Sequence, residues 1–179
     1  MQGNNDKNAK KTSSNHVSLK FKSLDTNVAL ARLVVSALAS EEELTLFDLE
    51  EIKVAVSEAV SNAIIHGYQN DPNCWVDLII ELENGNLTVH IIDKGVGIKD
   101  IALAMQPHFS GSEDADGRMG LGFSFMQSFM DKVDVISTVG QGTTIILSRN
   151  LRAQHLNINE DLFKGELFDE LSEISGGLK

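Results

Sequence analysis

The sequence predicts an α+β fold, a two-layer sandwich in which helices cover one face of a mainly antiparallel sheet. Segments with alternating apolar residues, the pattern of strands, are interspersed with segments whose apolar residues recur at helical spacing. Two pairs of strand-like segments are separated by only a few turn residues, which favours antiparallel hairpins. The 179 residues, 42% of them hydrophobic, suffice for one domain with a full core and are few for two.

A strand and a helix are expected first. Apolar and polar residues alternate over 16–22, which is a strand pattern, and apolar residues at helical spacing predict a helix from Val28 onward. Asp25, Thr26 and Asn27 are all residue types that cap helices, and the sequence leaves open which of them does so.

A longer helix and a hairpin follow. The helix is expected over 45–66 or 47–66, with Gly67 as its C-terminal stop. Strand patterns at 74–82 and 87–93 flank the turn sequence Glu-Asn-Gly-Asn, which predicts a hairpin.

The second half of the chain repeats these patterns. A short helix is expected at 100–105, a loop at 108–122 and a helix at 123–133, followed by strands at 133–138 and 143–150 around a glycine turn. The order strand, helix, helix, hairpin, loop, helix, hairpin places the helices together on one face of the sheet.

The two ends differ from the domain between them, which we place at 16–151. Residues 1–15 are polar and are expected to form a disordered arm. Residues 152–179 form an acidic tail, in which apolar residues among the acidic ones of 158–174 predict a short amphipathic helix. The tail is interpreted as a dispensable or partner-binding appendage, and a solvated helix is its simplest role.

Composition excludes several classes of function. The formal net charge of −11 argues against direct nucleic-acid binding. The single cysteine, Cys74, excludes an internal disulfide and fits a reducing compartment. No apolar run is long enough to span a membrane, and the N-terminus lacks the apolar region of a secretory signal, so a cytoplasmic protein is expected.

The first segment that carries chemistry is "EAVSNAIIHGY", residues 58–68. On a helix, Glu58, Asn62 and His66 form one polar column beside an apolar stripe. The Asn62 amide oxygen is a neutral ligand suited to Mg²⁺ beside phosphate, and Glu58 one turn earlier is suited to accept a proton. Taken alone, the segment is better explained as a solvated helix edge.

The second segment, "IIDKGVGI", places Asp93 at a strand end before Gly95 and Gly97. A carboxylate there can accept a hydrogen bond from an exocyclic amine such as that of adenine, and glycines let the backbone approach a flat ring. The alternative is a glycine turn that Asp93 merely caps.

The third segment, "GRMGLGFSFM", places Gly120 and Gly122 at the start of a helix, where free backbone N–H groups bind phosphate. Arg118 adds a charge-assisted donor. The alternative is a flexible loop whose glycines only ease the helix start. No Gly-Lys-Ser/Thr follows, so this is not a Walker loop.

In combination the three segments supply a metal ligand with a base, an adenine acceptor and a phosphate cradle. The chain resembles the GHKL (Bergerat-type) ATPase and kinase superfamily, whose N, G1 and G2 boxes are similar to "EAVSNAIIHG", "DKGVG" and "GLG". Within it, "QPHF", "MGLGFSFMQSFMD" and "GTTI" resemble the sporulation anti-sigma-F factors, which are serine kinases. The resemblance covers roughly residues 16–151.

The resemblance implies ATP and Mg²⁺ as cofactors and assigns roles to residues. Asn62 resembles the Mg²⁺ ligand and Glu58 the catalytic base. Asp93 resembles the adenine-binding aspartate. Thr143 resembles the threonine that backs the adenine site, with Thr144 left open as the alternative.

The same resemblance concerns the glycines and two arginines. Gly95 and Gly97 shape the adenine pocket, and Gly120 and Gly122 match phosphate-binding glycines. The remaining roles are a lid arginine, Arg118, and a partner-binding arginine on the first helix, Arg32. His66 receives no role beyond that of a helix-end residue. The acidic stretch "SGSEDADG" departs from the hydroxyl-rich, basic lids of the family.

The implied function is an anti-sigma factor. It holds a sporulation sigma factor inactive with ATP bound, phosphorylates a serine of an anti-anti-sigma partner and forms a homodimer through its sheet. Two alternatives stay open: a switch kinase for a general-stress sigma factor, and a sigma-binding adaptor without kinase activity. A sensor histidine kinase is disfavoured, because the short polar stretch before the first strand cannot supply a phospho-accepting helix pair.

Overall fold

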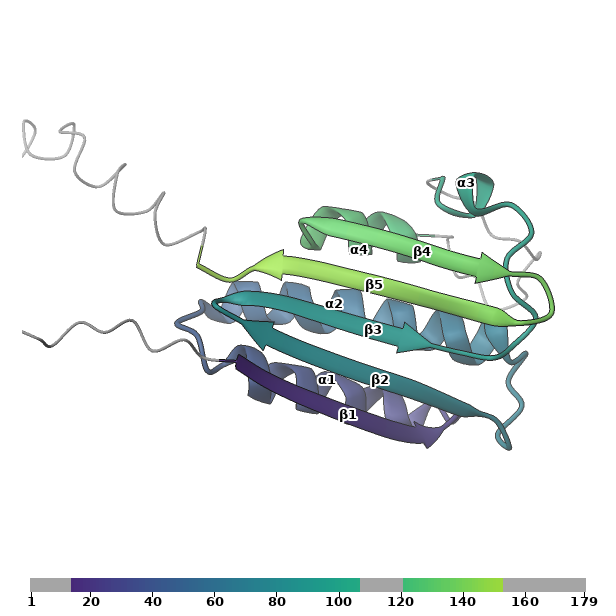
Figure 1. Cartoon of the computed structure of the whole chain (residues 1–179), viewed down its shortest axis with the longest axis horizontal. Helices are drawn as coiled ribbons and strands as arrows, with labels where there is room; N and C mark the ends of the chain where they lie inside the picture. Colours follow the sequence, from purple (N-terminus) through teal and green to yellow (C-terminus); the bar gives the residue numbers. More distant parts are fainter. Residues whose placement is uncertain (1–13, 107–120, 153–179) are drawn as a thin grey trace, which may run out of the picture.

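Two layers make up the described part of the chain, residues 14–106 and 121–152 of a computed structural model (Figure 1). The elements in chain order are β1 (Ser14–Lys22), α1 (Thr26–Ala39), α2 (Leu46–Asn62), the π-helical turn η1 (Ala63–Gly67), β2 (Trp75–Glu83), β3 (Asn86–Ile92), α3 (Ile101–Ala104), α4 (Gly122–Phe129), β4 (Lys132–Thr138) and β5 (Gly142–Asn150). Most of the predicted arm (1–15) lies outside the described residues. The same is true of nearly all of the predicted loop (108–122) and of the acidic tail (152–179).

The five strands form one sheet in the order β1-β2-β3-β5-β4, with every neighbouring pair antiparallel. Helices α1, α2 and α4 lie together behind this sheet in Figure 1, so its other face is open. The predicted α+β sandwich is therefore confirmed. No helix of the described residues is long and apolar enough to cross a membrane.

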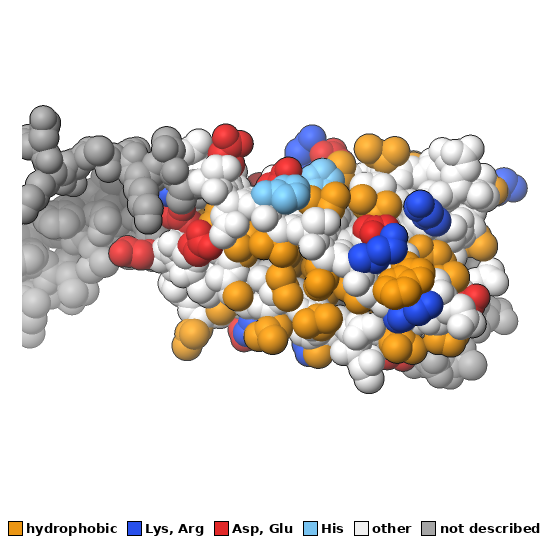
Figure 2. Space-filling view, turned by 60° about the horizontal axis from the view of Figure 1, so that its bottom comes forward, with side chains coloured by type: hydrophobic (Ala, Val, Ile, Leu, Met, Phe, Trp, Pro, Cys, Tyr) orange, Lys and Arg blue, Asp and Glu red, His pale blue; other side chains and the backbone are white. Residues whose placement is uncertain are grey.

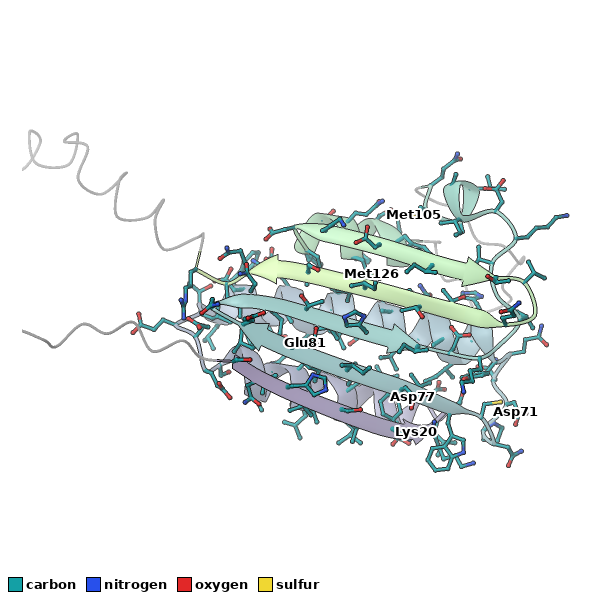
Figure 3. All side chains as sticks on the ribbon, in the orientation of Figure 1. Lys20, Asp71, Asp77, Glu81, Met105 and Met126 are labelled. Carbon is teal, nitrogen blue, oxygen red and sulfur yellow. The ribbon has the colours of Figure 1, made fainter. Side chains whose placement is uncertain are left out.

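Alternation along the strands divides the two faces of the sheet. In β2, Val76, Leu78 and Ile80 are fully buried beneath the helices. The residues between them point to the open face, where Lys20 of β1 pairs with Asp77 at 3.0 Å between Nζ and Oδ1 (Figure 3). A period of two thus buries one side of each strand.

The helix ends are set by local chemistry. Thr45 caps α2 in a capping box with Asp48, in which each side chain bonds the other residue's backbone N–H. Asp25 occupies the N-cap position of α1 without a side-chain hydrogen bond, whereas the Asn27 amide donates to the carbonyl of Lys22. Helix α4 ends at Phe129, four residues earlier than predicted, because Lys132 already belongs to β4.

A buried ion network fastens the sheet to the helices. The Arg149 side chain of β5 is only 4% exposed and contacts Asp48 Oδ1 at 2.9 Å and Glu51 Oε2 at 2.8 Å, both on α2. Its other amine donates to the carbonyl of Phe129 at the end of α4 at 2.9 Å. One guanidinium therefore joins three elements and pairs with two carboxylates near the N-terminus of α2.

We expect Arg149→Met to lower the free energy of unfolding by about 3–5 kcal/mol, because it leaves the buried carboxylate of Asp48 and the half-buried carboxylate of Glu51 without their cation. Thermal unfolding should show a fall in melting temperature of roughly 10–20 °C. Arg152→Met is the matched control, since that guanidinium pairs with Glu42 at a more exposed site and should matter little. Equal effects of the two substitutions would contradict the role given to Arg149.

Candidate functional site

Asp93 lies directly after β3, where its backbone extends the ladder to β5. Its N–H donates to the carbonyl of Thr143 at 2.9 Å. Its side chain accepts from the backbone N–H groups of Gly95 at 2.8 Å and Thr143 at 3.3 Å, through Oδ1 in both cases. Two bonds to one oxygen fix the carboxyl plane and leave Oδ2 available for a donor from outside.

The residue Asp93 is buried, with 6% of its surface exposed. Burial raises the pKa of Asp93 above its ordinary value, and the N–H groups of Gly95 and Thr143 offset only part of that rise. A buried carboxylate in this state is stabilised when it gains a further hydrogen-bond donor. The site is therefore suited to a ligand with an N–H group that points inward.

Two glycines permit the close packing around this carboxyl. A methyl group on Gly67, at the end of η1, would lie 2.9 Å from Asp93 Cγ. A methyl group on Gly95 would overlap the carbonyl oxygen of Gly67, which accepts a hydrogen bond from Val96 N at 3.0 Å. Any side chain at either position would push η1 away from the strand end.

Two hydroxyls lie behind Asp93. Thr143 is buried, and its Oγ1 lies 2.9 Å from the hydroxyl of Ser137 on β4. The Ser137 hydroxyl also accepts from Ile98 N at 2.8 Å, which holds the loop after Gly97. Thr144 alternates to the open face of the sheet, so the geometry favours Thr143 over Thr144 beside Asp93.

Tyr68 and Ser137 are site residues that sequence reasoning missed. The Tyr68 hydroxyl donates to the carbonyl of Trp75 at 2.6 Å and accepts from Lys94 N at 2.7 Å. Burial raises the pKa of this phenol, an effect that the N–H of Lys94 opposes. Tyr68, directly after η1, is thus bonded both to the start of β2 at Trp75 and to the chain just after β3 at Lys94. The tyrosine directly after "HG" was the one available signal.

Glu58 and Asn62 lie one turn apart on α2 and both are half-buried. A methyl group on Gly122, the first residue of α4, would lie 2.9 Å from Glu58 Oε2 and 3.6 Å from both amide atoms of Asn62. The start of α4 therefore packs against these two side chains. The structure brings together three residues that the sequence assigned to the phosphate end of the site.

His66 leaves the polar column that the sequence predicted. The last turn of this helix is the π-helical η1, which has more residues per turn than an α-helix. His66 is exposed, whereas Glu58 and Asn62 are half-buried. The extra residue in the turn lets Gly67 reach Asp93. Left-handed backbone then follows at Gln69 and Asn70 rather than at Gly67.

The remaining candidates are spread over the chain. Gly97 has a φ of +72° and packs on the backbone of Thr138 at the β4–β5 turn. Arg32 is exposed on α1. Arg118 and Gly120 lie outside the described residues. Within 14–106 and 121–152, no group of three His, Cys, Asp or Glu residues is placed to hold a metal ion.

The site therefore has two ends joined by one helix. Asp93 and Gly67 mark an end that accepts a donor, and Glu58, Asn62 and the start of α4 mark an end with oxygen ligands and a helix N-terminus. Nine residues separate Glu58 from Gly67, roughly 13 Å along the helix axis. A long ligand with an amine at one end and anionic groups at the other fits this arrangement.

The chain is similar in sequence to known proteins. Residues 21–149 match the family described as the histidine kinase-like ATPase domain. An anti-sigma F factor from Geobacillus kaustophilus is 43% identical over 137 residues, which are 76% of this chain and 93% of that protein. An anti-sigma F factor from Clostridium acetobutylicum is 42% identical over 135 residues, 75% of this chain and 93% of its own length.

Solved structures share the fold at low identity. A chain with the RsbU and RsbW domains of a Mycobacterium tuberculosis protein superposes with a TM-score of 0.55 at 19% identity, over 76% of this chain and 32% of that one. The Erythrobacter litoralis blue-light-activated histidine kinase gives 0.50 at 18% identity, over 74% and 43%. By its sequence match and its relatives, the chain belongs to the histidine kinase-like ATPase domain family and, within it, to the anti-sigma F factors.

Proposed function

We propose that the chain is an ATP-dependent serine kinase that also holds a sporulation sigma factor inactive. The observation that carries this proposal is the two-ended site, in which one helix contacts Asp93 at its end and carries Glu58 and Asn62 along its length. The names of the relatives support an anti-sigma role, and the family supports ATP binding. A regulator of a polymerase subunit acts in the cytoplasm, which is the location that we propose.

The adenine end is built around Asp93. Its second carboxyl oxygen would accept the exocyclic amine of adenine, while Thr143 and the Ser137 hydroxyl back the ring edge. Gly95 and Gly97 would line the ring without side chains in its way. Adenine therefore satisfies the buried carboxylate whose pKa burial raises.

The phosphate end is built around α2 and the start of α4. Asn62 would contribute an amide oxygen to Mg²⁺, which neutralises phosphate charge when it is bound. The absence of a side chain at Gly122 lets the start of α4 pack directly against Glu58 and Asn62. Gly120 and Arg118 would extend the phosphate contacts. Glu58 would orient and deprotonate an attacking serine hydroxyl.

The proposed protein partners are two. The serine belongs to an anti-anti-sigma factor, which phosphorylation inactivates, and the retained protein is the sigma factor. Arg32, exposed on α1, is the proposed partner contact. The test is to incubate the chain with labelled ATP and each partner. Phosphoserine on the anti-anti-sigma factor and ATP-dependent retention of sigma are expected; failure of both would refute the proposal.

The proposed homodimer forms through the open face of the sheet. This face carries exposed apolar side chains, including Trp75 at 45% and Ile136 at 63% exposure. Ile79, Ile92 and Ile146 point to the same side and do not contribute to the core. Such a patch of exposed apolar side chains is typical of a subunit interface.

Asp93→Asn should weaken ATP binding roughly hundredfold, because the amide either donates toward the adenine amine or loses its charge-assisted bond. Isothermal titration calorimetry measures this affinity. The asparagine oxygen can still accept from Gly95 and Thr143, so the backbone should be retained. Unchanged affinity would contradict the placement of adenine at Asp93.

Without nucleotide, Asp93→Asn should raise the melting temperature at pH 7. The raised pKa of Asp93 means that the folded state binds a proton more readily than the unfolded state. Keeping Asp93 ionised in the folded state therefore lowers the free energy of unfolding. This loss is fully present above the folded-state pKa and disappears as the pH falls below the unfolded-state pKa of about 3.9. The difference between variant and wild type should therefore shrink toward pH 4, which thermal scans across pH can check. A gain that persists unchanged at low pH would contradict this origin.

Glu58→Ala should keep nucleotide affinity within a few fold and slow phosphotransfer by roughly 10²–10⁴-fold, the usual contribution of a general base. Single-turnover transfer from labelled ATP gives the rate, and calorimetry gives the affinity. Ser57→Ala, a neighbour whose hydroxyl bonds the carbonyl of Lys53, is the matched control. Full activity of the Glu58 variant would remove its assignment as base.

Ile79→Asp should convert the proposed dimer into monomer, since it places a charge in the centre of the open sheet face. Sedimentation velocity gives the mass directly. Ala37→Asp introduces the same charge on the exposed side of the helix layer and should leave the dimer intact. A dimer that tolerates the Ile79 change would place the interface elsewhere.

A further inference from the structure

The outer side of helix α1 is apolar although it is exposed. The helix buries Ala31, Val35 and Leu38 toward the core. The opposite side, which we call the α1 outer face, consists of Ala29, Leu30, Leu33 and Ala37 at helical spacing, all of them exposed. Leu33 is 67% and Leu30 39% exposed. A surface helix normally carries polar residues on this side, so the α1 outer face has the character of a covered surface.

Charge distinguishes this face from its surroundings. Helix α1 contains no Asp or Glu, and its single charged residue is the exposed Arg32. Helix α2, in contrast, carries three acidic residues in its first six positions. Figure 2, in which the edge with β1 and α1 comes forward, shows hydrophobic side chains across the lower half of the view. An acidic, apolar segment would meet less repulsion at α1 than at α2.

This chain contains a segment of that kind. Residues 158–174 carry six acidic residues and one lysine, a net charge of −5. Phe163, Leu167, Leu171 and Ile174 recur at spacings of four, four and three, which places them on one face of a helix. The segment follows the family match, which ends at residue 149. We propose that 158–174 forms a helix that docks on the α1 outer face of the same chain.

The position of Arg152 brings this segment within reach. Its guanidinium donates twice to Glu42, at 2.8 and 2.7 Å, and Glu42 lies three residues after the end of α1. Leu151 N also donates to the carbonyl of Gly85 at 2.7 Å. The five residues from 153 to 157 span up to about 17 Å when extended, and the 17 residues of 158–174 are roughly 25 Å long as a helix, whereas the 14 residues of α1 are roughly 21 Å long. The segment can therefore begin near the C-terminal end of α1 and lie along that helix.

Segment 158–174 matches the α1 outer face both in apolar surface and in charge. Apolar side chains of 158–174 would cover Leu30 and Leu33, and the flanking carboxylates would lie near Arg32. A tethered segment gains a high effective concentration at a nearby surface, so modest contacts suffice for occupancy. The docked segment would compete with any partner that binds at Arg32; this consequence alone rests on the proposed function.

The test measures access to α1 in the full chain. Ala37→Cys, made together with Cys74→Ser, places the single thiol on the α1 outer face, and its labelling rate by a maleimide is recorded. Adding Phe163→Asp and Leu167→Asp should raise that rate by roughly fivefold or more, because labelling follows the fraction of time that the face is uncovered. Leu156→Asp with Leu178→Asp adds the same two charges outside 158–174 and should leave the rate unchanged.

A second reporter thiol, Thr138→Cys, lies on β4 at the opposite edge of the sheet from β1. It detects nonspecific effects of the tail changes on labelling, and its labelling rate should be the same in all tail variants. Equal rates at Ala37→Cys with and without the Phe163 and Leu167 changes would overturn the proposal. Protection that falls on roughly hundredfold dilution would also overturn it, because a second copy would then be the occupant. Protection that is independent of concentration when Ile79→Asp has removed the proposed dimer, and that is lost with the tail changes, supports intramolecular docking.

Discussion

A buried carboxylate at the end of β3 is the constraint on which the candidate site depends. Asp93 is held by backbone N–H groups from two directions, and it tolerates this position only because the backbone around it comes unusually close. Gly67 and Gly95 have no side chains there, so η1 can lie against the strand end. The same helix carries Glu58 and Asn62, and its docking at Asp93 therefore fixes both ends of the site at once.

Helix α2 is fastened at both ends, by two different kinds of interaction. At its N-terminus, Asp48 and Glu51 meet the buried Arg149, and the strength of that contact comes from charge neutralisation. At the far end, Gly67 meets Asp93 through packing and backbone hydrogen bonds. This arrangement separates stability from function. The ion network can stabilise the fold without contacting Asp93, and the end of β3 can keep a destabilising buried carboxyl.

Periodicity explains which parts could be predicted from the sequence. Strand and helix positions followed from repeats of two and of three to four residues, because burial on one side imposes those repeats. The π-helical turn could not be predicted, since its extra residue is selected by the contact between Gly67 and Asp93, far apart in sequence. The same holds for Ser137 and Tyr68. Serine and tyrosine have ordinary structural uses, and only the tertiary fold places their hydroxyls beside the strand ends.

The predicted end of α4 shows the opposite case, in which a correct local pattern is overridden. Apolar residues continue at helical spacing beyond Phe129, but Val133 and Val135 pack on the core as members of β4. Pairing with β5 uses the backbone groups that a longer helix would have used internally. The Phe129 carbonyl, left without a helical partner by this early end, accepts from Arg149. Strand β4, which ends α4 early, thus lies beside β5, and Arg149 of β5 donates to the last carbonyl of α4.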